Sequence, residues 1–335
     1  MKDKARRSGL CVILALAIST LAAQAHAESI KVAIGTGGVG HLFIAQDKGY
    51  FAAEGLTVEF VPFAAAEPAA VAVASGAVEF GATGLSGALY SLGSQGVLRI
   101  IAGSLRETPG FRFLTVVVSK HAWDAGWTSF KGLGGHSVAV PQIGSPSHYS
   151  TALIAEKYGI DLKTVRVLPV QSVPNTISAA TGGQADAAVM PLVPVAPSID
   201  RGDVKLLGYV GDETPWQIHA LFTTGKIATE QPALVERFLR AYRKGATEMH
   251  DAFTGPDGTR QDGPQAEAVL ALLAKYTGQT VAQAKLSIPY VDAEARLDVK
   301  DVLHQIAWYK QQNMVKGAVD DSVIDRRYVS PLPDR

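Results

Sequence analysis

The chain has 335 residues, with 31 basic and 31 acidic side chains, so its formal net charge at pH 7 is zero. No stretch is strongly basic, which argues against a nucleic-acid partner. The single cysteine, Cys11, lies near the N-terminus, and the rest of the chain therefore offers neither disulfides nor thiolate metal ligands.

The first 27 residues have the pattern of a secretory signal peptide. Basic residues precede an apolar run at 10–23, and residues 25–27 (AHA) match an A-x-A cleavage pattern. The apolar run is too short to cross a bilayer comfortably. Cleavage would remove four of the 31 basic residues and one of the 31 acidic ones. The expected mature chain begins at Glu28, has no cysteine and carries a net charge of about −3.

Two stretches of the chain resemble each other. Residues 30–63 and 137–170 both have the pattern of a strand, a Gly/Ser loop, a helix, a Gly turn and a second strand. A pattern of small residue, Gly, two variable residues, acid and apolar residue also recurs at 75–80 and 182–187. The repetition predicts an internal duplication that produces two similar α/β lobes.

The first lobe is predicted to alternate strands and helices, which is typical of a mainly parallel sheet flanked by helices. Its expected strands are 31–34, 56–63, 78–81 and 98–102, and its expected helices are 41–51, 68–75 and 87–92. The β-branched run 113–119 then enters the second lobe.

The second lobe is predicted to repeat this order. Its expected strands are 137–140, 165–170, 185–190 and 205–210, and its expected helices are 146–158 and 173–181. A strand at 219–223 returns to the first lobe, on which helices 232–250, 265–276 and 299–314 are expected to pack.

We therefore expect the first lobe to comprise residues 28–112 and 216–335, and the second lobe to comprise residues 113–215. The two crossings, near 112–115 and 211–219, would act as a hinge that lets the lobes close on a ligand.

Four blocks of sequence occur in order along the chain: GYF–EGLTV at 49–58, ASGAVEFG at 74–81, VAV–GSPSH at 138–148 and QADA at 184–187. Together they resemble the signature blocks of periplasmic solute-binding proteins of ABC importers. The branch that they resemble includes the aliphatic sulfonate-, taurine- and nitrate-binding proteins and the thiamine-precursor binders. The sequence departs from the family pattern in its glycine-rich loop at 35–40 and at Met190-Pro191, both where ligand is expected.

This resemblance implies a two-lobed type II binding-protein fold in the periplasm. It implies a monomer that captures a small molecule and delivers it to an ABC permease in the inner membrane, with no cofactor, no bound metal and no enzymatic activity. A small organic anion is the expected ligand, first a sulfonate and second a carboxylate.

Helix N-termini are the expected anion site, because their N–H groups are unpaired and their dipoles are positive. We expect two to face each other across the cleft. One is formed by Gly38, Val39, Gly40 and His41, and the other by Ser145, Ser147, His148 and Tyr149. Ser145 suits an N-cap and the proline after it suits the first helical position.

Further contacts are expected from the strand ends and the crossovers. Leu85 and Ser86 follow a strand of the first lobe, and Met190 is their counterpart in the second. Leu85, Met190, Tyr149 and Trp216 would pack the carbon part of the ligand. Trp216 and His219 would form a lid or aromatic wall, and Arg112 would clamp an acid group.

Several alternatives remain open. The loop at 35–40 fits G-x-G-x-x-G, but an exported chain would meet no nicotinamide cofactor, and the second copy of the loop lacks the motif. A neutral heterocycle such as a thiamine-precursor pyrimidine would keep the fold and change the ligand. An exported enzyme or a sensor on the same scaffold are further possibilities, although the histidines form no catalytic cluster.

Overall fold

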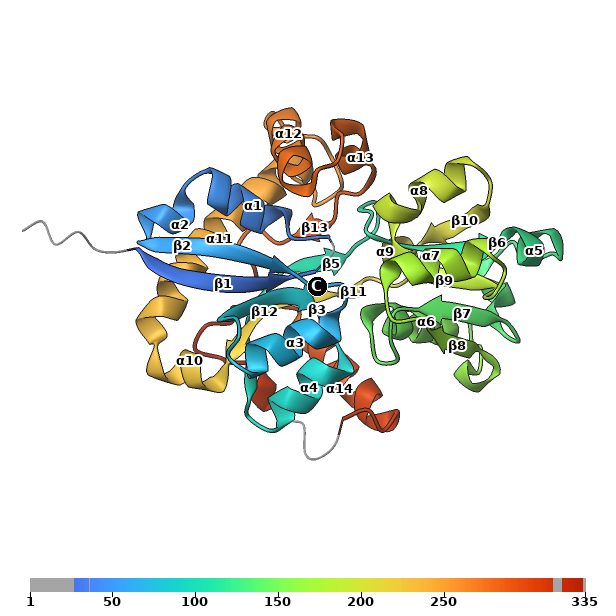
Figure 1. Ribbon diagram of the computed structural model, residues 1–335, viewed down its shortest axis with the longest axis horizontal. Coiled ribbons are helices and arrows are strands. Elements are labelled where there is room, and N and C mark those ends of the chain that lie inside the picture. Colours follow the sequence, from blue (N-terminus) through green and yellow to red (C-terminus); the bar gives the residue numbers. More distant parts are fainter. Residues whose placement is uncertain (1–26, 36, 316–320, 334–335) are drawn as a thin grey trace, which may run out of the picture.

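A computed structural model describes residues 27–35, 37–315 and 321–333. It has two α/β lobes side by side, with a small sheet between them (Figure 1). The expected signal peptide lies outside the described residues except for Ala27. No helix of the described part is long and apolar enough to cross a membrane.

The sheet of the first lobe has the strand order β2-β1-β3-β12-β4. Strand β1 pairs in parallel with β2 and β3, whereas β12 pairs antiparallel with β3 and β4. The sheet is therefore mixed, with only β12 reversed. Its strands are β1 (Glu28–Ile34), β2 (Leu56–Pro62), β3 (Phe80–Gly84), β4 (Leu98–Gly103) and β12 (His219–Thr224).

The sheet of the second lobe has the order β10-β6-β9-β7-β8, with only β6 reversed. When it is read from β8, its order and directions repeat those of the first sheet, which confirms the predicted duplication of architecture. Its strands are β6 (Leu114–Ser119), β7 (Ser137–Val140), β8 (Arg166–Pro169), β9 (Ala187–Pro191) and β10 (Val204–Tyr209).

Helices flank both sheets, as expected. Those of the first lobe are α1 (Gly40–Asp47), α2 (Tyr50–Ala53), α3 (Ala66–Ala74), α4 (Gly87–Ser94), α10 (Gly225–Glu230), α11 (Pro232–Phe253), α12 (Ala266–Thr277), α13 (Val281–Leu286) and α14 (Val299–Gln311). Those of the second lobe are α5 (Lys120–Asp124), α6 (Pro146–Lys157), α7 (Val173–Thr181), α8 (Leu192–Asp200) and α9 (Val210–Glu213). Short 3₁₀ turns occur at Phe130–Leu133, Leu162–Thr164 and Asp321–Val323.

Some elements differ from the sequence prediction, among them α5, α8, α10 and α13, which it does not include, and α14, which ends at Gln311 and not at 314. The helix expected at 41–51 is divided into α1 and α2, because Gly49 takes a left-handed conformation with φ of 70°. Strand β3 is displaced toward Gly84. Helix α3 begins at Ala66, before Pro68, because a proline is tolerated anywhere in a first helical turn and does not mark the first residue.

The amphipathic helix α11 forms much of the first lobe's core. The ring of Phe238 stacks on Phe80 of β3 with a centroid distance of 4.3 Å, and the buried face of α11 lies along α1. Burial of such a side chain contributes about 1.5–3 kcal/mol to stability. This packing fixes α1, and with it the glycine-rich loop that precedes α1.

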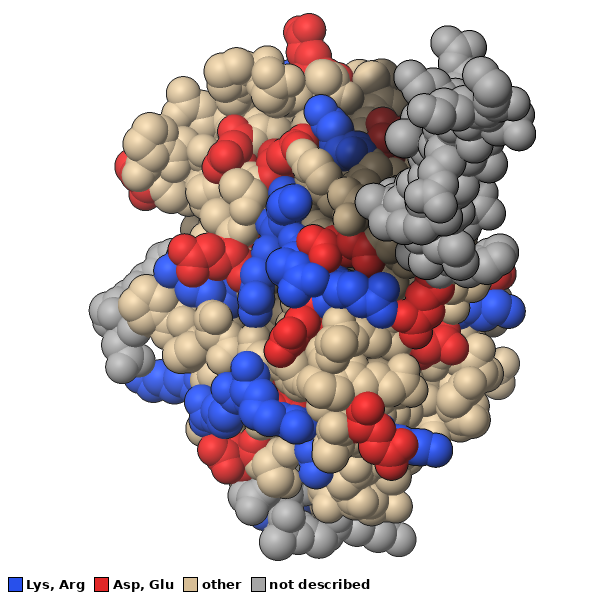
Figure 2. Space-filling model, turned by 90° about the vertical axis from the view of Figure 1, so that its left-hand side faces the viewer, with Lys and Arg blue, Asp and Glu red and all other residues tan. Residues whose placement is uncertain are grey.

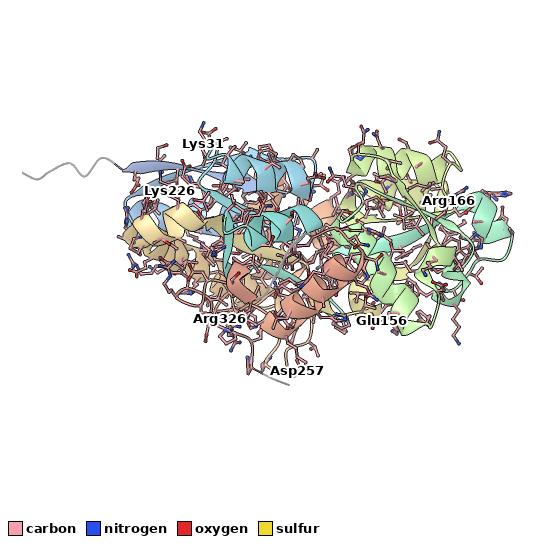
Figure 3. The ribbon with its side chains drawn as sticks, turned by 90° about the horizontal axis from the view of Figure 1, so that it is seen from below. Lys31, Glu156, Arg166, Lys226, Asp257 and Arg326 are labelled. Carbon is pink, nitrogen blue, oxygen red and sulfur yellow. The ribbon has the colours of Figure 1, made fainter. Side chains whose placement is uncertain are left out.

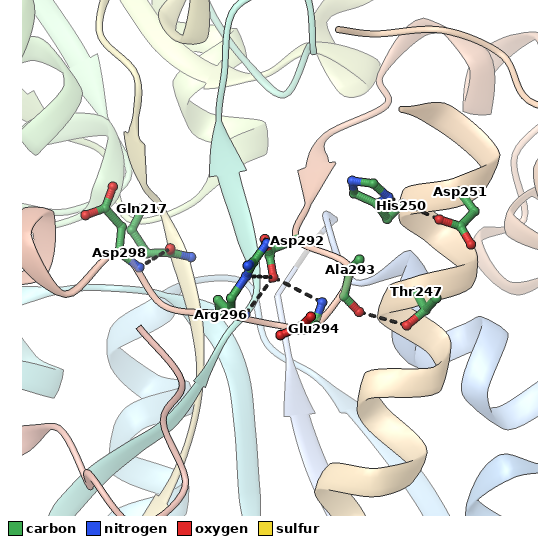
Figure 4. A network of polar contacts seen from close by, with 9 residues as sticks. All are labelled: Gln217, Thr247, His250, Asp251, Asp292, Ala293, Glu294, Arg296 and Asp298. Carbon is green, nitrogen blue, oxygen red and sulfur yellow. Dashed lines mark hydrogen bonds and ion pairs between the residues drawn. The ribbon is translucent and has the colours of Figure 1, made fainter. Parts of the chain in front are cut away.

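The small central sheet joins β5 (Leu105–Glu107), β11 (Trp216–Gln217) and β13 (Tyr290–Val291), which come from three distant parts of the chain. The segment after β13 is held by Asp292, whose Oδ1 accepts hydrogen bonds from the N–H of Glu294 and from the N–H and Nε of Arg296 (Figure 4). All strands of the second sheet lie within residues 113–215, the range expected for the second lobe. The residues at which the chain passes from one lobe to the other remain a prediction from the sequence.

The outer end of the first lobe carries mixed charge (Figure 2). Arg240 pairs with Glu54 at 2.7 Å, Lys48 pairs with Glu248 at 3.6 Å, and Arg237 pairs with Glu28. Each of these three cations is paired with a carboxylate. They therefore do not form a basic patch that would bind a polyanion such as a nucleic acid.

Candidate ligand-binding site

A small cavity of about 80 Å³ lies between the two lobes. The first lobe contributes Gly35, Gly37, Phe63, Ala64, Ala65, Ala66, Thr83, Gly84, Ile218 and His219. The second lobe contributes Phe113, Leu114, Pro141, Gln142, Ser145, Pro146, Ser147, Val173 and Pro191. We call this space the first cavity.

The first cavity is narrow because α6 approaches the end of β3 closely. A Cβ atom on Gly84 would lie 2.4 Å from Cγ of Pro146, which is less than any real contact. Glycine at this position therefore allows the first turn of α6 to meet the first lobe.

Two helix N-termini line the first cavity. In α6, Oγ of the N-cap Ser145 accepts a hydrogen bond from the N–H of His148 at 3.4 Å, and the N–H of Ser147 has no partner among the described residues. In α3, the N-cap Ala65 is extended and has no side-chain acceptor for the N–H groups of the first turn. Both helix ends present positive dipole character and unpaired donors to the cavity.

Thr83 and His219 add polar groups to the same cavity. Thr83 is 1 % exposed and His219 is 6 % exposed, and neither Thr83 Oγ1 nor His219 Nδ1 has a hydrogen-bond partner in the described part of the chain. Burial, and next the charge of His41, lower the pKa of His219 to about 3, so its ring is neutral at pH 7. Buried polar atoms are normally paired, and these two are free to bind a ligand.

A second cavity of about 310 Å³ adjoins the first. Both cavities are lined by Gly35, Gly37, Phe113 and Pro191. The remaining lining of the second cavity is Ile34, Gly38, Val39, Gly40, Phe43, Pro62, Val193, Pro194, Met249, Leu273, Tyr276, Thr277, Gln279, Ala284, Ser287 and Pro289. Gly38 has φ of 77°, and a Cβ there would lie 2.3 Å from Cδ2 of Leu105, so only glycine fits this part of the loop.

Neither cavity is lined by Lys, Arg, Asp or Glu among the described residues. Charged side chains such as Lys31, Lys226 and Arg166 instead lie on the outer edges of the molecule (Figure 3). The described residues also contain no group of three or more His, Cys, Asp or Glu side chains that would hold a metal ion. Any charge on a bound ligand would therefore meet backbone N–H groups and dipoles, with no ionic side chain lining either cavity.

The structure separates the two helix starts that the sequence pairs. Ser145 and Ser147 line the first cavity, whereas Gly38, Val39 and Gly40 line the second. The N-terminus that shares the first cavity with α6 is that of α3. Its uncapped sequence, Ala-Ala-Ala-Glu-Pro, is the signal that would have indicated a helix start with free donors.

Four residues expected to pack the carbon part of a ligand line neither cavity. Tyr149 and Trp216 are fully buried and pack edge to face at 4.9 Å. The N–H of Leu85 donates to the carbonyl of Ile218, and Met190 lies in a small core of the second lobe. Trp308 of α14 covers Tyr149, which leaves no space for ligand there.

The remaining candidates also have structural partners. His41 is fully buried, lies edge-on to Tyr242 at 4.8 Å, and has a pKa lowered to about 3 by burial. Its Nδ1 has no hydrogen-bond partner among the described residues, but His41 lines neither cavity. His148 Nδ1 accepts a hydrogen bond from the N–H of Gly144 at 3.0 Å. Ser86 caps α4 by accepting from the N–H of Leu89.

Arg112 does not lie at either cavity. Its guanidinium stacks on the ring of Tyr209 at 4.5 Å and borders a separate surface groove. The predicted clamp of an acid group by this side chain thus has no support in the geometry.

The chain belongs to the NMT1/THI5-like family, whose model matches residues 38–252. Its fold is that of the periplasmic binding proteins. A comparison with curated protein sequences found no match.

Solved structures share this fold at low sequence identity. The periplasmic aliphatic sulphonate-binding protein SsuA from Escherichia coli is 17 % identical, with 92 % of this chain and 94 % of that chain covered and a TM-score of 0.67. The periplasmic nitrate-binding protein NrtA from Synechocystis PCC 6803 is 12 % identical, with 88 % and 84 % covered and a TM-score of 0.62. A mutant of DSZB in complex with biphenyl-2-sulfinic acid is 13 % identical, with 91 % and 97 % covered and a TM-score of 0.55.

Proposed function

We propose that this protein is the periplasmic substrate-binding component of an ABC import system. It captures a small organic anion, a sulfonate or a carboxylate, between its lobes. It acts as a monomer without enzymatic activity and delivers its ligand to a permease in the inner membrane. The proposal is supported by the fold shared with SsuA and NrtA, which bind sulphonates and nitrate.

The meeting of two helix N-termini at the first cavity carries the proposal of an anionic ligand. The N–H groups of Ala66 and Glu67 in α3 and of Ser147 in α6 have no acceptor among the described residues, and both dipoles favour negative charge at the same place. The acid group would lie between Ala65–Ala66 and Ser147. Thr83 Oγ1 and His219 Nδ1 would complete its hydrogen bonds.

The uncharged lining favours a second candidate, a neutral heterocycle such as a thiamine-precursor pyrimidine. Phe63, Phe113 and His219 place three rings around the first cavity, and a planar ligand stacks well on such rings. Thr83 and His219 would then bind the polar edge of the heterocycle.

A thermal-shift screen of the chain from Glu28 onward tests both candidates. The probes are sulfonates, carboxylates, inorganic oxyanions and pyrimidines. A ligand at 100 times its Kd adds about 2.7 kcal/mol to the free energy of unfolding and raises Tm visibly. A shift with organic anions is expected. Shifts with neutral rings alone would replace the anion with the heterocycle, and no shift with any probe would contradict the transport function.

Replacing Thr83 by valine is expected to weaken binding and to stabilise the free protein. The Thr83 hydroxyl is buried without a partner among the described residues, so valine removes a desolvation cost of about 1 kcal/mol or more. In the complex the lost hydrogen bond costs about tenfold in affinity, because a bond to a charged group contributes about 1.5 kcal/mol or more. Urea unfolding and calorimetric titration measure the two effects.

Thr223 in the neighbouring strand provides the matched control. Its Oγ1 donates to the carbonyl of Glu79 at 2.7 Å, and its side chain is fully buried. Thr223→Val should therefore destabilise the protein by about 1–3 kcal/mol and leave ligand affinity unchanged. If the two valine variants behave alike, Thr83 is not a ligand contact.

A further inference from the structure

His219 is the only ionisable side chain in the lining of the first cavity among the described residues. The other polar side chains there, those of Thr83, Gln142, Ser145 and Ser147, carry no charge near neutral pH. An acid group bound in this cavity would therefore meet no charged partner. Because an ion that leaves water without a paired charge is strongly destabilised, a proton on His219 is the one source of positive charge that the lining offers.

The ring of His219 is held in place with a nitrogen atom free. The carbonyl of His219 accepts hydrogen bonds from Nε2 of Gln217 at 2.8 Å and from the N–H of Ser104 at 3.2 Å, which fixes the backbone. The ring packs edge to face on Phe113 at 5.5 Å. Since Nδ1 has no partner in the described part of the chain, the ring can donate from this atom to a ligand without losing an existing bond.

The elements around His219 bring no carboxylate that would hold a proton on its ring. Strand β3 pairs with it through Gly84, and the glycine-rich loop approaches its ring at Gly35 and Gly38. The charged residues of the neighbouring strand β5 have partners of their own. Arg106 pairs with Asp298 at 2.6 Å, and Glu107 accepts from the N–H of Leu114 at 2.9 Å.

His41 of α1 is the one titratable side chain whose charge acts on His219. Burial, and next that charge, lower the pKa of His219 to about 3. A second positive charge beside it would oppose protonation, so both influences keep the ring neutral in the free protein. An anion acts in the opposite direction, because an opposite charge within about 4–6 Å favours the charged form of a group.

We infer that the protein takes up one proton from the solvent with each organic anion, and that His219 holds this proton against the acid group of the ligand. This inference rests on the proposed function and adds how an uncharged site supplies a counter-charge. In the complex both ring nitrogens of His219 carry a proton, and the ring donates to the acid group together with the N–H groups of α3 and α6. A neutral ligand would bind without the proton.

The sign of the pH dependence follows from the two states of His219. The ring has a pKa of about 3 in the free protein and a higher pKa in the complex. Between these two values the complex holds a proton that the free protein lacks. Affinity for the anion should therefore fall about tenfold for each unit by which pH rises, until the pKa of the complex is passed.

Calorimetric titration of the chain from Glu28 onward with methanesulfonate and ethanesulfonate, between pH 5 and pH 8, tests the inference. These probes stay ionised over this range, so their own titration does not contribute. Each titration is repeated in two buffers with different ionisation enthalpies, because the difference in heat reports the protons taken up. About one proton per ligand is expected near pH 5. Binding with no proton uptake at any pH would overturn the inference and leave the proposed function standing.

Two histidine variants assign the proton. His219→Asn keeps an amide donor near the position of Nδ1 but takes no proton, so its affinity should not vary with pH. His41→Asn is the matched control, because His41 is equally buried, also has a pKa lowered to about 3, and lines neither cavity. It should keep the proton uptake of the wild type.

The remaining outcomes are also decisive. Proton uptake that persists in His219→Asn, or that is lost in His41→Asn alone, would overturn the assignment to His219. The wild-type titrations do not depend on how well either variant folds. Failure of the wild-type protein to bind both sulfonates and acetate would instead contradict the anionic ligand of the proposed function, and with it this inference.

Discussion

Replacing Ala65 by aspartate is expected to abolish anion binding while stabilising the free protein. Ala65 is the N-cap of α3, its backbone is extended with φ of −155° and ψ of 162°, and it lines the first cavity. These are the dihedral angles of a capping residue, so an aspartate here can accept from the N–H of Glu67, while Pro68 at the third helical position has no N–H to donate. It should add about 1 kcal/mol to the free energy of unfolding.

The same carboxylate would take the donors proposed for the ligand and place a fixed negative charge beside its acid group. Two like charges about 4 Å apart near a protein surface repel by about 4 kcal/mol, so affinity for an organic anion should fall by at least about 100-fold. Calorimetric titration measures this loss.

Ala65→Asn is the control, because asparagine caps equally well, has the same shape and carries no charge. It should bind the anion far better than Ala65→Asp does. A neutral heterocycle would bind both variants equally, and equal binding of an anion by both would show that its acid group lies elsewhere.

Replacing Glu107 by glutamine is expected to remove a strong pH dependence of stability. Glu107 is 1 % exposed, and its Oε1 accepts a hydrogen bond from the N–H of Leu114 at 2.9 Å. Its carboxyl group also accepts from Gly211, so it joins both crossovers between the lobes. Burial, supported by the nearby Asp212 charge, raises the pKa of Glu107 to about 8.

The raised pKa determines the sign of the effect. Between the unfolded value of 4.5 and about 8, the folded protein holds a proton that the unfolded chain has lost, so the contribution of Glu107 to stability falls as pH rises. From pH 6 to pH 8 the loss should be about 2 kcal/mol, at about 1.4 kcal/mol per unit.

Urea unfolding of the wild-type protein and of Glu107→Gln at several values between pH 6 and pH 8 measures the difference directly. The buried histidines His41, His148 and His219, whose pKa values are lowered by burial, contribute equally to both proteins and cancel. Glu59→Gln, at an exposed side chain, should give a curve parallel to the wild type. If the free energy of unfolding of Glu107→Gln also varies with pH in parallel with the wild type, the pKa of Glu107 is not raised.

Local signals predicted the elements and part of the site. Ser145 followed by a proline indicated the start of α6, and the structure has Ser145 as its N-cap. The repeated strand and helix pattern predicted two similar lobes, and both sheets have the same strand order. Caps and strand or helix patterns depend on residues that are only a few positions apart. They can therefore be recognised in the sequence without knowledge of the fold.

Contacts between distant segments explain the errors. Tyr149 and Trp216 follow the pattern of cleft residues, but Trp308, from a helix near the C-terminus, packs against Tyr149 and closes that region. The central sheet needs β13 to reach β5, a pairing that no local pattern in either segment indicates.

The sequence by itself determined the two α/β lobes and the start of α6 with its N-cap Ser145, because capping, periodicity and turn chemistry act over one or two helical turns. Only the tertiary structure decided that α3, and not α1, meets α6 at the first cavity. It also decided that Thr83 and His219 keep polar atoms there that no described residue pairs. A cavity is the space that remains after distant segments have packed, so its lining depends on how closely they approach, as Gly84 and Pro146 do.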